Sequence, residues 1–307
     1  MSTDVIETVQ RATPLAVAFY DPLTDAAITD GLAVIARPSA HTGSFRRAVT
    51  TPGGVHVVSG IRAMHDIEFS RVGPGERAEP FDDDLPSAST VDIDVVVEDR
   101  FRRFLTTVMR LAAPRRGVVT AADALEGCAA LVMSVPDDTP MFLMSSPHRS
   151  IPASTAVVRA CLRRHSDLEP AAPAVLTVEC AGIVTVGVAD EHGNVAVPFA
   201  YPSFDGSALP SPPAGAHGTP TTDQQWPVEI GVRWEPDQLD VATPAGIDVP
   251  RVHAVFCQRS GTVFADDVGP DAPSLASTLE YGVPLVLQTT GPTDPTRASY
   301  LLIEPAT

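Results

Sequence analysis

A histidine and a glutamate at H-x-x-E spacing are the strongest indication of chemistry in the chain. His65 and Glu68 could supply two ligands of a zinc ion, and zinc-dependent peptidases combine this spacing with a distant third histidine. His192, far along the chain, could be that third ligand. The chain has eight histidines, so such a pair arises easily by chance. A zinc-dependent peptidase is therefore the third of our hypotheses for function.

Patterns typical of nucleophilic catalysis by serine or cysteine are absent from the sequence. It has no G-x-S-x-G motif, which would place a serine on a sharp strand-to-helix turn. Its cysteines lack C-x-x-C spacing and protease-like surroundings, and we expect them to be buried thiols. They are Cys128, Cys161, Cys180 and Cys257.

A group of aspartates lies in the first third of the chain. Asp82–Asp84 with Asp92 and Asp94 could be taken for a calcium site, but the spacing and central glycine of an EF-hand are missing. A solvated acidic loop is the favoured interpretation. We therefore expect no enzyme activity, no cofactor and no metal.

The charge of the chain limits its partners. The formal net charge is −17, and all 21 basic lysine or arginine positions are arginine. A phosphate-binding surface needs clustered positive charge, so we expect neither nucleic-acid binding nor membrane insertion. The N-terminus has no basic region followed by an apolar core, and no run approaches about 18 apolar residues. We expect the protein to be cytoplasmic.

The elements that must position these residues are strands. Apolar residues alternate on both sides of the turn at Asp190–Asn194, which predicts a β-hairpin over 183–201. The 30 prolines and 21 glycines separate short apolar runs, as in loop-rich β-proteins. We therefore predict an all-β fold with one short helix over 121–125. Strands are expected, among other places, at 91–97, 101–111, 155–162, 175–180 and 252–258.

The length of 307 residues allows two domains. We predict two β-sandwich domains, Ig-like or transthyretin-like, joined by irregular segments. Residues 1–13 form a polar arm, 14–145 the first domain and 146–307 the second. A Pro/Gly-rich loop interrupts the second domain at 203–223.

Several turns resemble those of carboxypeptidase-regulatory-like domains, which are transthyretin-like β-sandwiches. Asp21–Val34 resembles their opening strand, turn and second strand, although Asp25 stands where the family usually has glycine. Ala189–Val195 matches their Asp-x-x-Gly turn, and Pro52–Val55 matches it loosely. The resemblance implies rigid modules that are appended to other machinery and carry no catalytic residues.

Two further segments, Val95–Leu105 and Leu143–Pro152, resemble parts of accessory proteins of bacterial contractile injection systems. These phage-tail-like particles assemble in the cytoplasm. Our leading hypothesis is therefore a non-enzymatic structural or interaction subunit of such a particle, with other protein subunits as its partners. The alternative is an adhesin module that binds carbohydrate or protein.

Four residues are our candidates for contact with a partner. Arg102, Arg103 and Phe104 are the candidates in the first half of the chain. Trp226, beside Pro227 at the edge of the 203–223 loop, is the candidate in the second half. By contrast, Trp234 alternates with other apolar residues, and we expect it to pack in a core.

Overall fold

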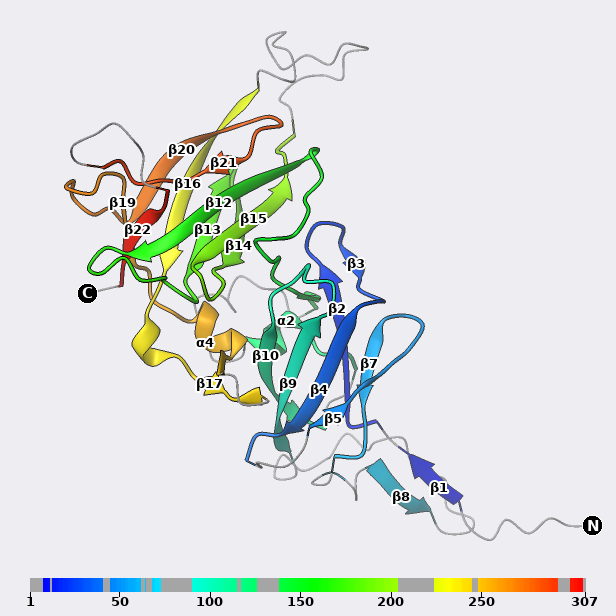
Figure 1. Cartoon of the computed structure of the whole chain (residues 1–307). Coiled ribbons are helices and arrows are strands. Elements are labelled where there is room, and N and C mark those ends of the chain that lie inside the picture. The colour runs from blue at the N-terminus through cyan, green and yellow to red at the C-terminus, as the bar shows by residue number, and fades with distance from the viewer. Residues whose placement is uncertain are drawn as a thin grey trace, which may run out of the picture.

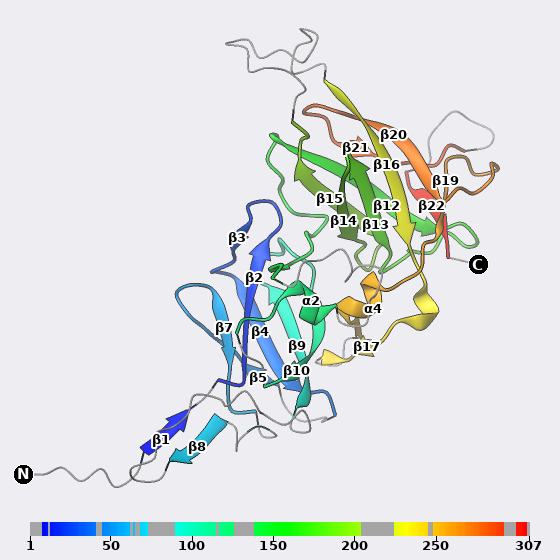
Figure 2. The same ribbon diagram turned by 180° about the vertical axis from the view of Figure 1, so that it is seen from behind.

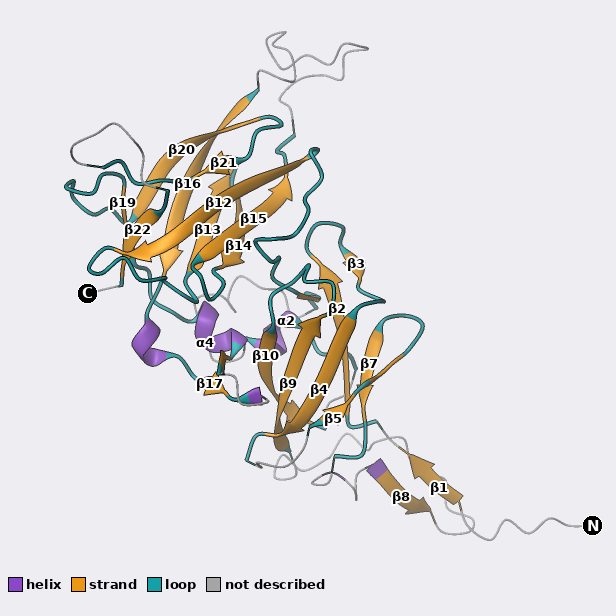
Figure 3. Ribbon diagram, in the orientation of Figure 1, coloured by secondary structure: helices purple, strands orange, loops and turns teal. Residues whose placement is uncertain are grey.

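The structure is a computed structural model of the chain. It describes residues 8–11, 13–40, 45–61, 64, 68–72, 90–114, 117–125, 138–203, 224–244, 248–291 and 299–305. The predicted loop 203–223, except Ser203, and most of the predicted arm 1–13 lie outside these residues, as do Asp82–Asp84. Regular structure in the described part is nearly all β, which confirms the all-β prediction (Figure 3). None of its helices has the length and apolar character needed to cross a bilayer.

The first group of strands forms two sheets and a ribbon (Figure 1). One sheet has the order β10-β9-β4-β5, and the other has the order β11-β2-β7-β6 with β3 beside β2. The two-stranded ribbon β1-β8 projects from these sheets in both views (Figures 1 and 2). The bounds are β1 (Thr8–Arg11), β2 (Leu15–Asp21), β3 (Ala26–Ala27), β4 (Leu32–Pro38), β5 (Arg46–Arg47), β6 (Val49–Thr50), β7 (Val55–Val58), β8 (Phe69–Val72), β9 (Val91–Asp99), β10 (Thr107–Ala113) and β11 (Met141–Phe142).

Alternation along these strands builds one core between the two sheets. Ile93, Val95 and Val97 of β9 face Val17 and Phe19 of β2 in a single buried cluster. Each buried aliphatic side chain of this size contributes about 1.5–3 kcal/mol through removal of apolar surface from water. The predicted short helix is confirmed as α2 (Ala121–Ala124), which packs on the same cluster.

The second group of strands also forms two sheets around one core (Figure 1). One has the order β15-β12-β22-β19 with β21 beside β12, and the other has the order β14-β13-β16-β20. Trp234 is buried in this core, as predicted. The bounds are β12 (Thr155–Arg164), β13 (Val175–Cys180), β14 (Ile183–Val188), β15 (Asn194–Ala200), β16 (Gln225–Arg233), β19 (Thr262–Phe264), β20 (Ser274–Glu280), β21 (Leu285–Val286) and β22 (Leu301–Glu304).

The strands predicted over 183–201 exist, but they do not form a hairpin. β14 pairs with β13, whereas β15 pairs with β12 in the other sheet. The turn between them is closed locally, because Asp190 accepts the backbone N–H of Gly193 and bonds Asn194. Beyond it the two strands belong to different sheets. The hairpin prediction is wrong because alternation identifies a strand without identifying its partner.

A segment of the second half returns to the first group of strands (Figure 2). Ala242 packs with Val96 and Val108 on the outer face of the first sheet. Residues 252–258, predicted as a strand, begin with a helix whose apolar side packs on the first core. The elements are η4 (Pro236–Gln238), β17 (Val241–Ala242), β18 (Val249–Pro250) and α4 (Val252–Phe256).

The two groups also touch directly. Val175 of β13 and Val188 of β14 belong to the buried cluster of the first group. The second sandwich therefore buries part of its outer sheet face against the first. A domain boundary between residues 145 and 146 stays a prediction, and the return of 236–256 means that the first core draws on both sides of it.

Substitution of two glycines, Gly193 in the β14–β15 turn and Gly182 as its control, tests whether this turn packs against its surroundings. Gly193 has φ +81°, and a Cβ there would overlap the carbonyl oxygen of Leu162. Gly182, in the turn between β13 and β14, has φ +79°, but among the described residues no atom outside its chain neighbours lies within 4 Å of its Cβ position. We predict that Gly182→Ala costs about 1–2 kcal/mol from the left-handed backbone alone. Gly193→Ala should cost at least about 1–3 kcal/mol more, because the overlap forces the turn to move.

The measurement is the free energy of unfolding in urea for both variants and the wild type. Equal losses of stability in the two variants would show that the turn does not pack against Leu162.

Candidate functional site

Arg251 and Asp94 form a buried ion pair between the returning segment and β9. Arg251 donates from Nε to Asp94 Oδ1 at 3.1 Å and from Nη2 to Oδ2 at 3.0 Å. The two residues are 5% and 1% exposed. A charge at this depth is tolerated only with a well-oriented partner, and two parallel N–H···O bonds supply that geometry. The prediction of a solvated acidic group is therefore wrong for Asp94, because the returning segment covers it.

Three more side chains complete the network around this pair. Arg251 also bonds Asp240 through Nη1, and Ser39 Oγ donates to Asp94 Oδ1 at 2.8 Å. Arg110 lies 3.4 Å from Asp94 and 3.6 Å from Asp240. Two acidic and two basic groups thus compensate one another. Burial alone raises the pKa of Asp94, but hydrogen bonds from Arg251 and Ser39 and the charges of both arginines outweigh it and hold the pKa below its ordinary 3.8.

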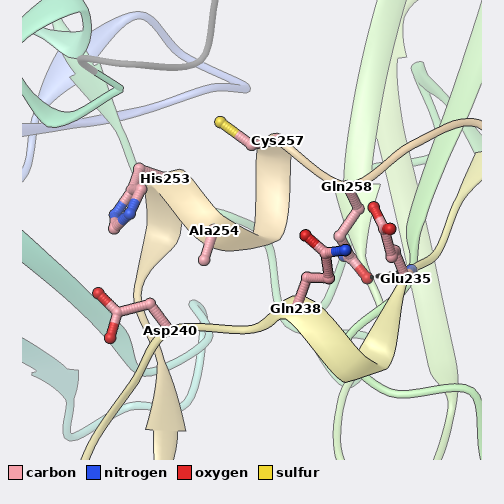
Figure 4. A pocket seen from close by; sticks show the side chains of 7 residues that line it. All are labelled: Glu235, Gln238, Asp240, His253, Ala254, Cys257 and Gln258. Carbon is pink, nitrogen blue, oxygen red and sulfur yellow. Dashed lines mark hydrogen bonds between the residues drawn. The ribbon is translucent and has the colours of Figure 1, made fainter.

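A hollow of about 180 Å³ lies beside the network (Figure 4). It is smaller than the roughly 300–1,000 Å³ of ordinary ligand pockets. Gln258 accepts the N–H of Glu235 and donates to the carbonyl of Pro173, so its side chain joins α4 to the second group of strands. Burial is the main cause that lowers the pKa of His253, which favours the neutral ring. The lining residues are Glu235, Gln238, Asp240, His253, Ala254, Cys257 and Gln258.

The cysteines do not all match the expectation of buried thiols. Cys180 is a buried free thiol whose pKa is raised by burial, and Cys161 is free and half-buried. Cys257 is exposed and disulfide-bonded, so the expectation is wrong there. In Figure 4 its sulfur points away from the hollow. Cys128 lies outside the described residues.

The described part of the chain does not assemble the zinc site. Glu68 is buried, and its Oε2 accepts the backbone N–H of Gly60 at 2.6 Å. His192 lies exposed in the β14–β15 turn, 3.5 Å from the carboxylate of Glu191. His65 lies outside the described residues. Among those described, no three His, Cys, Asp or Glu residues are grouped so that they could hold a metal ion.

The three candidate contact residues of the first half separate in the structure. Arg102 is exposed, with φ +56°, in the connection between β9 and β10. Arg103 is half-buried, and it pairs with Asp99 and Asp30 at 3.0 Å each. Phe104 is 4% exposed and belongs to the first core, so its ring is not available at the surface. The predicted strand 101–111 begins only at Thr107, because residues 100–103 form this turn.

Trp226, the fourth candidate, takes part in an aromatic cluster. Its ring lies 5.4 Å from that of Tyr201, which in turn lies 4.7 Å from that of Tyr281. Trp226 and Tyr201 are half-buried against the second core, and Tyr201 Oη accepts the N–H of Gly282. Tyr281 was not identified from the sequence, because it is brought to the cluster from the end of β20. These rings cover one end of the second core.

Strand β14 exposes apolar side chains at the edge of its sheet. Ile183 is 63% and Val184 is 61% exposed. β14 is an edge strand, paired in the described structure with β13 alone. The alternation of Val184, Val186 and Val188 marked the strand, but it gave no indication of this exposed position at a sheet edge. β14 is therefore the most apolar exposed edge among the described strands.

Comparison with known proteins does not add an assignment. No protein-family model matches the chain, and no curated protein matches it.

Removal of one partner from the buried pair should be strongly destabilising. We predict that Arg251→Met lowers the free energy of unfolding by about 3–5 kcal/mol, because the buried Asp94 carboxylate loses its bidentate partner and keeps only the more distant Arg110, at 3.4 Å, as a basic neighbour. The matched control is Arg259→Met. The Arg259 side chain, which pairs with Glu235, is 60% exposed, and ion pairs made by exposed side chains contribute little to stability. Chemical unfolding monitored by circular dichroism compares the two. Similar stabilities for both variants would contradict the importance of the buried network.

The network also predicts a pH dependence. Because the pKa of folded Asp94 lies below 3.8, its contribution to stability is complete above pH 3.8 and is lost as pH falls through the folded pKa. The stability difference between wild type and Asp94→Asn should therefore be constant above pH 3.8 and shrink below it. Urea titrations at a series of acidic pH values measure this. A difference that stays constant in acid would contradict the assignment.

Proposed function

We propose that the chain is a non-enzymatic structural or interaction subunit of a phage-tail-like contractile injection particle. The observation that carries the proposal is that the buried charged groups of the chain pair with one another. Asp94, Arg251, Asp240 and Arg110 bond one another, and the neighbouring hollow is small and crossed by the structural hydrogen bonds of Gln258. Charges arranged in this way hold elements of the fold together.

The architecture supports an assembly role. Two groups of strands are joined by direct packing and by a returning segment, which suits a part that must keep its shape while neighbours bind. Arg149 adds to this rigidity, because it bonds both carboxylate oxygens of Asp21, at 2.9 and 2.5 Å, from the connection between the groups. The resemblances at Val95–Leu105 and Leu143–Pro152 are the reason for proposing a contractile injection particle as the assembly. The partners would be protein subunits.

The proposed assembly role implies a cytoplasmic protein. Such particles assemble in the cytoplasm. The disulfide at Cys257 fits an oxidising environment instead, since disulfides persist mainly outside the cytoplasm. A surface adhesin would meet such an environment, so the disulfide favours the second candidate.

The aromatic cluster favours the second candidate, a carbohydrate-binding adhesin module. Tyr201, Trp226 and Tyr281 gather three rings at one end of the second core, and sugar rings stack on such groups. Packing of two of these rings against the core weighs toward a structural role.

Purification of the tagged full chain from its source organism tests the proposal. We expect sheath and tube subunits to co-purify, identified by mass spectrometry, and tail-like particles to appear by electron microscopy. Neighbouring genes should encode the same subunits. Recovery of the chain free of particle proteins, with neighbouring genes for metabolic enzymes, would overturn the proposal. Specific glycan-array binding lost in Trp226→Ala would favour the adhesin.

A further inference from the structure

An exposed sheet edge can pair with another strand, and several edges among the described strands are protected against this. The edge of β10 is partly covered, because Arg251 of the returning segment forms a β-bridge with Val108. β15 contains Pro198, which has no N–H to donate, and β20 is rich in serine, threonine and glutamate. The edge strands β5, β6 and β11 are each two residues long. These are familiar ways to prevent unwanted pairing.

Within the described part of the chain, β14 has none of these protections. Its sequence, Ile-Val-Thr-Val-Gly-Val, contains no charge and no proline, and β-branched residues dominate it. Val186 and Val188 pack toward the first core, so the open part is the half that begins at Ile183. Because neighbouring side chains alternate, exposed Ile183 and Val184 present apolar surface on both faces of the edge.

A row of charge beside this edge indicates what it binds. Across the sheet Val184 lies opposite Glu179 of β13, and Glu179 lies opposite Glu229 of β16. Both glutamates are exposed, and like charges opposite one another are unfavourable. In the described part of the chain Glu229 accepts only the hydroxyl of Ser274, and neither glutamate has a cation as partner. The row would be stabilised by positive charge brought from outside.

The same row argues against a second copy of this chain. Pairing of two β14 edges would bring together two acidic rows on molecules that each carry a net charge of −17. A strand that alternates apolar and basic residues fits better. Its apolar side chains would cover Ile183 while its long basic side chains reach over Val184 toward Glu179.

We propose that the open edge of β14 is a docking site for an extended, basic–apolar strand of a partner protein. The strand adds to the sheet through backbone hydrogen bonds, and its arginine or lysine side chains neutralise Glu179 and Glu229. The inference rests on the interaction role proposed above and specifies the surface and the partner's chemistry.

Binding of a synthetic peptide to the full chain tests the proposal. The probe is a labelled peptide of alternating arginine and valine, and its control alternates glutamate and valine. We expect the basic peptide to bind at least about tenfold more tightly in fluorescence anisotropy, through strand addition and charge complementarity. Val184→Lys should weaken binding at least about tenfold, because a lysine on an edge blocks pairing.

The matched control is Val268→Lys, which adds the same charge at a 74% exposed valine in a turn after β19. This variant should bind as the wild type does, whereas general attraction to an acidic protein would affect both variants equally. Ile183→Lys is the second edge variant, and thermal unfolding confirms that each variant is folded. Equal binding by Val184→Lys and Val268→Lys, or no binding of the peptide by the wild type, overturns the proposal.

Two further results separate this inference from the proposed function. If sedimentation shows a wild-type dimer that Val184→Lys abolishes, a second copy occupies the edge and the basic partner is wrong. If Val184→Lys still enters particles as the wild type does, the docking site is wrong while the subunit role stands. If the peptide binds as expected but no particle contains the chain, the subunit role fails and the docking site stands.

Discussion

Burial of the Asp94 carboxylate is the constraint on which the arrangement of this protein depends. β9 faces the first core with Ile93, Val95 and Val97, so Asp94 must point to the opposite face of its sheet. Apolar Val96 shares that face, and it needs a cover as well. A cover that brought no cation would leave the desolvated carboxylate with Arg110, 3.4 Å away on β10, as its one basic neighbour in the described structure. The segment around Arg251 meets both needs, because it carries apolar residues and a guanidinium with fixed donor geometry.

This requirement explains the path of the chain. After β16 the chain leaves the second group of strands, crosses to the first, and then returns to form β19, β20 and β22. The excursion places α4 between the groups, where Gln258 bonds the backbone at Pro173 and Val255. Together with the packing of Val175 and Val188, it makes the two groups depend on each other. The interaction role proposed above would benefit from this dependence, because packing between the two groups holds their surfaces in fixed positions relative to each other.

The candidate residues show which properties are visible in a sequence. Period-two alternation predicted β9, β13, β14 and β15, because the direction of successive side chains in a strand is a local property. It did not predict that β14 and β15 join different sheets, since partner choice depends on packing across the whole core. Phe104 was a candidate for partner contact, yet after the turn at residues 100–103 its ring lies in the core. Tyr281 joined Trp226 only through the pairing of β16 with β20.

By itself, the sequence determined the all-β character, most strand positions, the short helix α2 and the acidic net charge, because each depends on neighbouring residues or on composition. Only the tertiary structure decided that Glu68 of the H-x-x-E motif accepts a hydrogen bond from a backbone N–H. It also decided that Arg251 covers Asp94 and that β14 has an open apolar edge. These outcomes join residues that are far apart in the chain, such as Asp94 and Arg251. Burial and pairing between such residues are set by the packing of complete sheets, which no local spacing records.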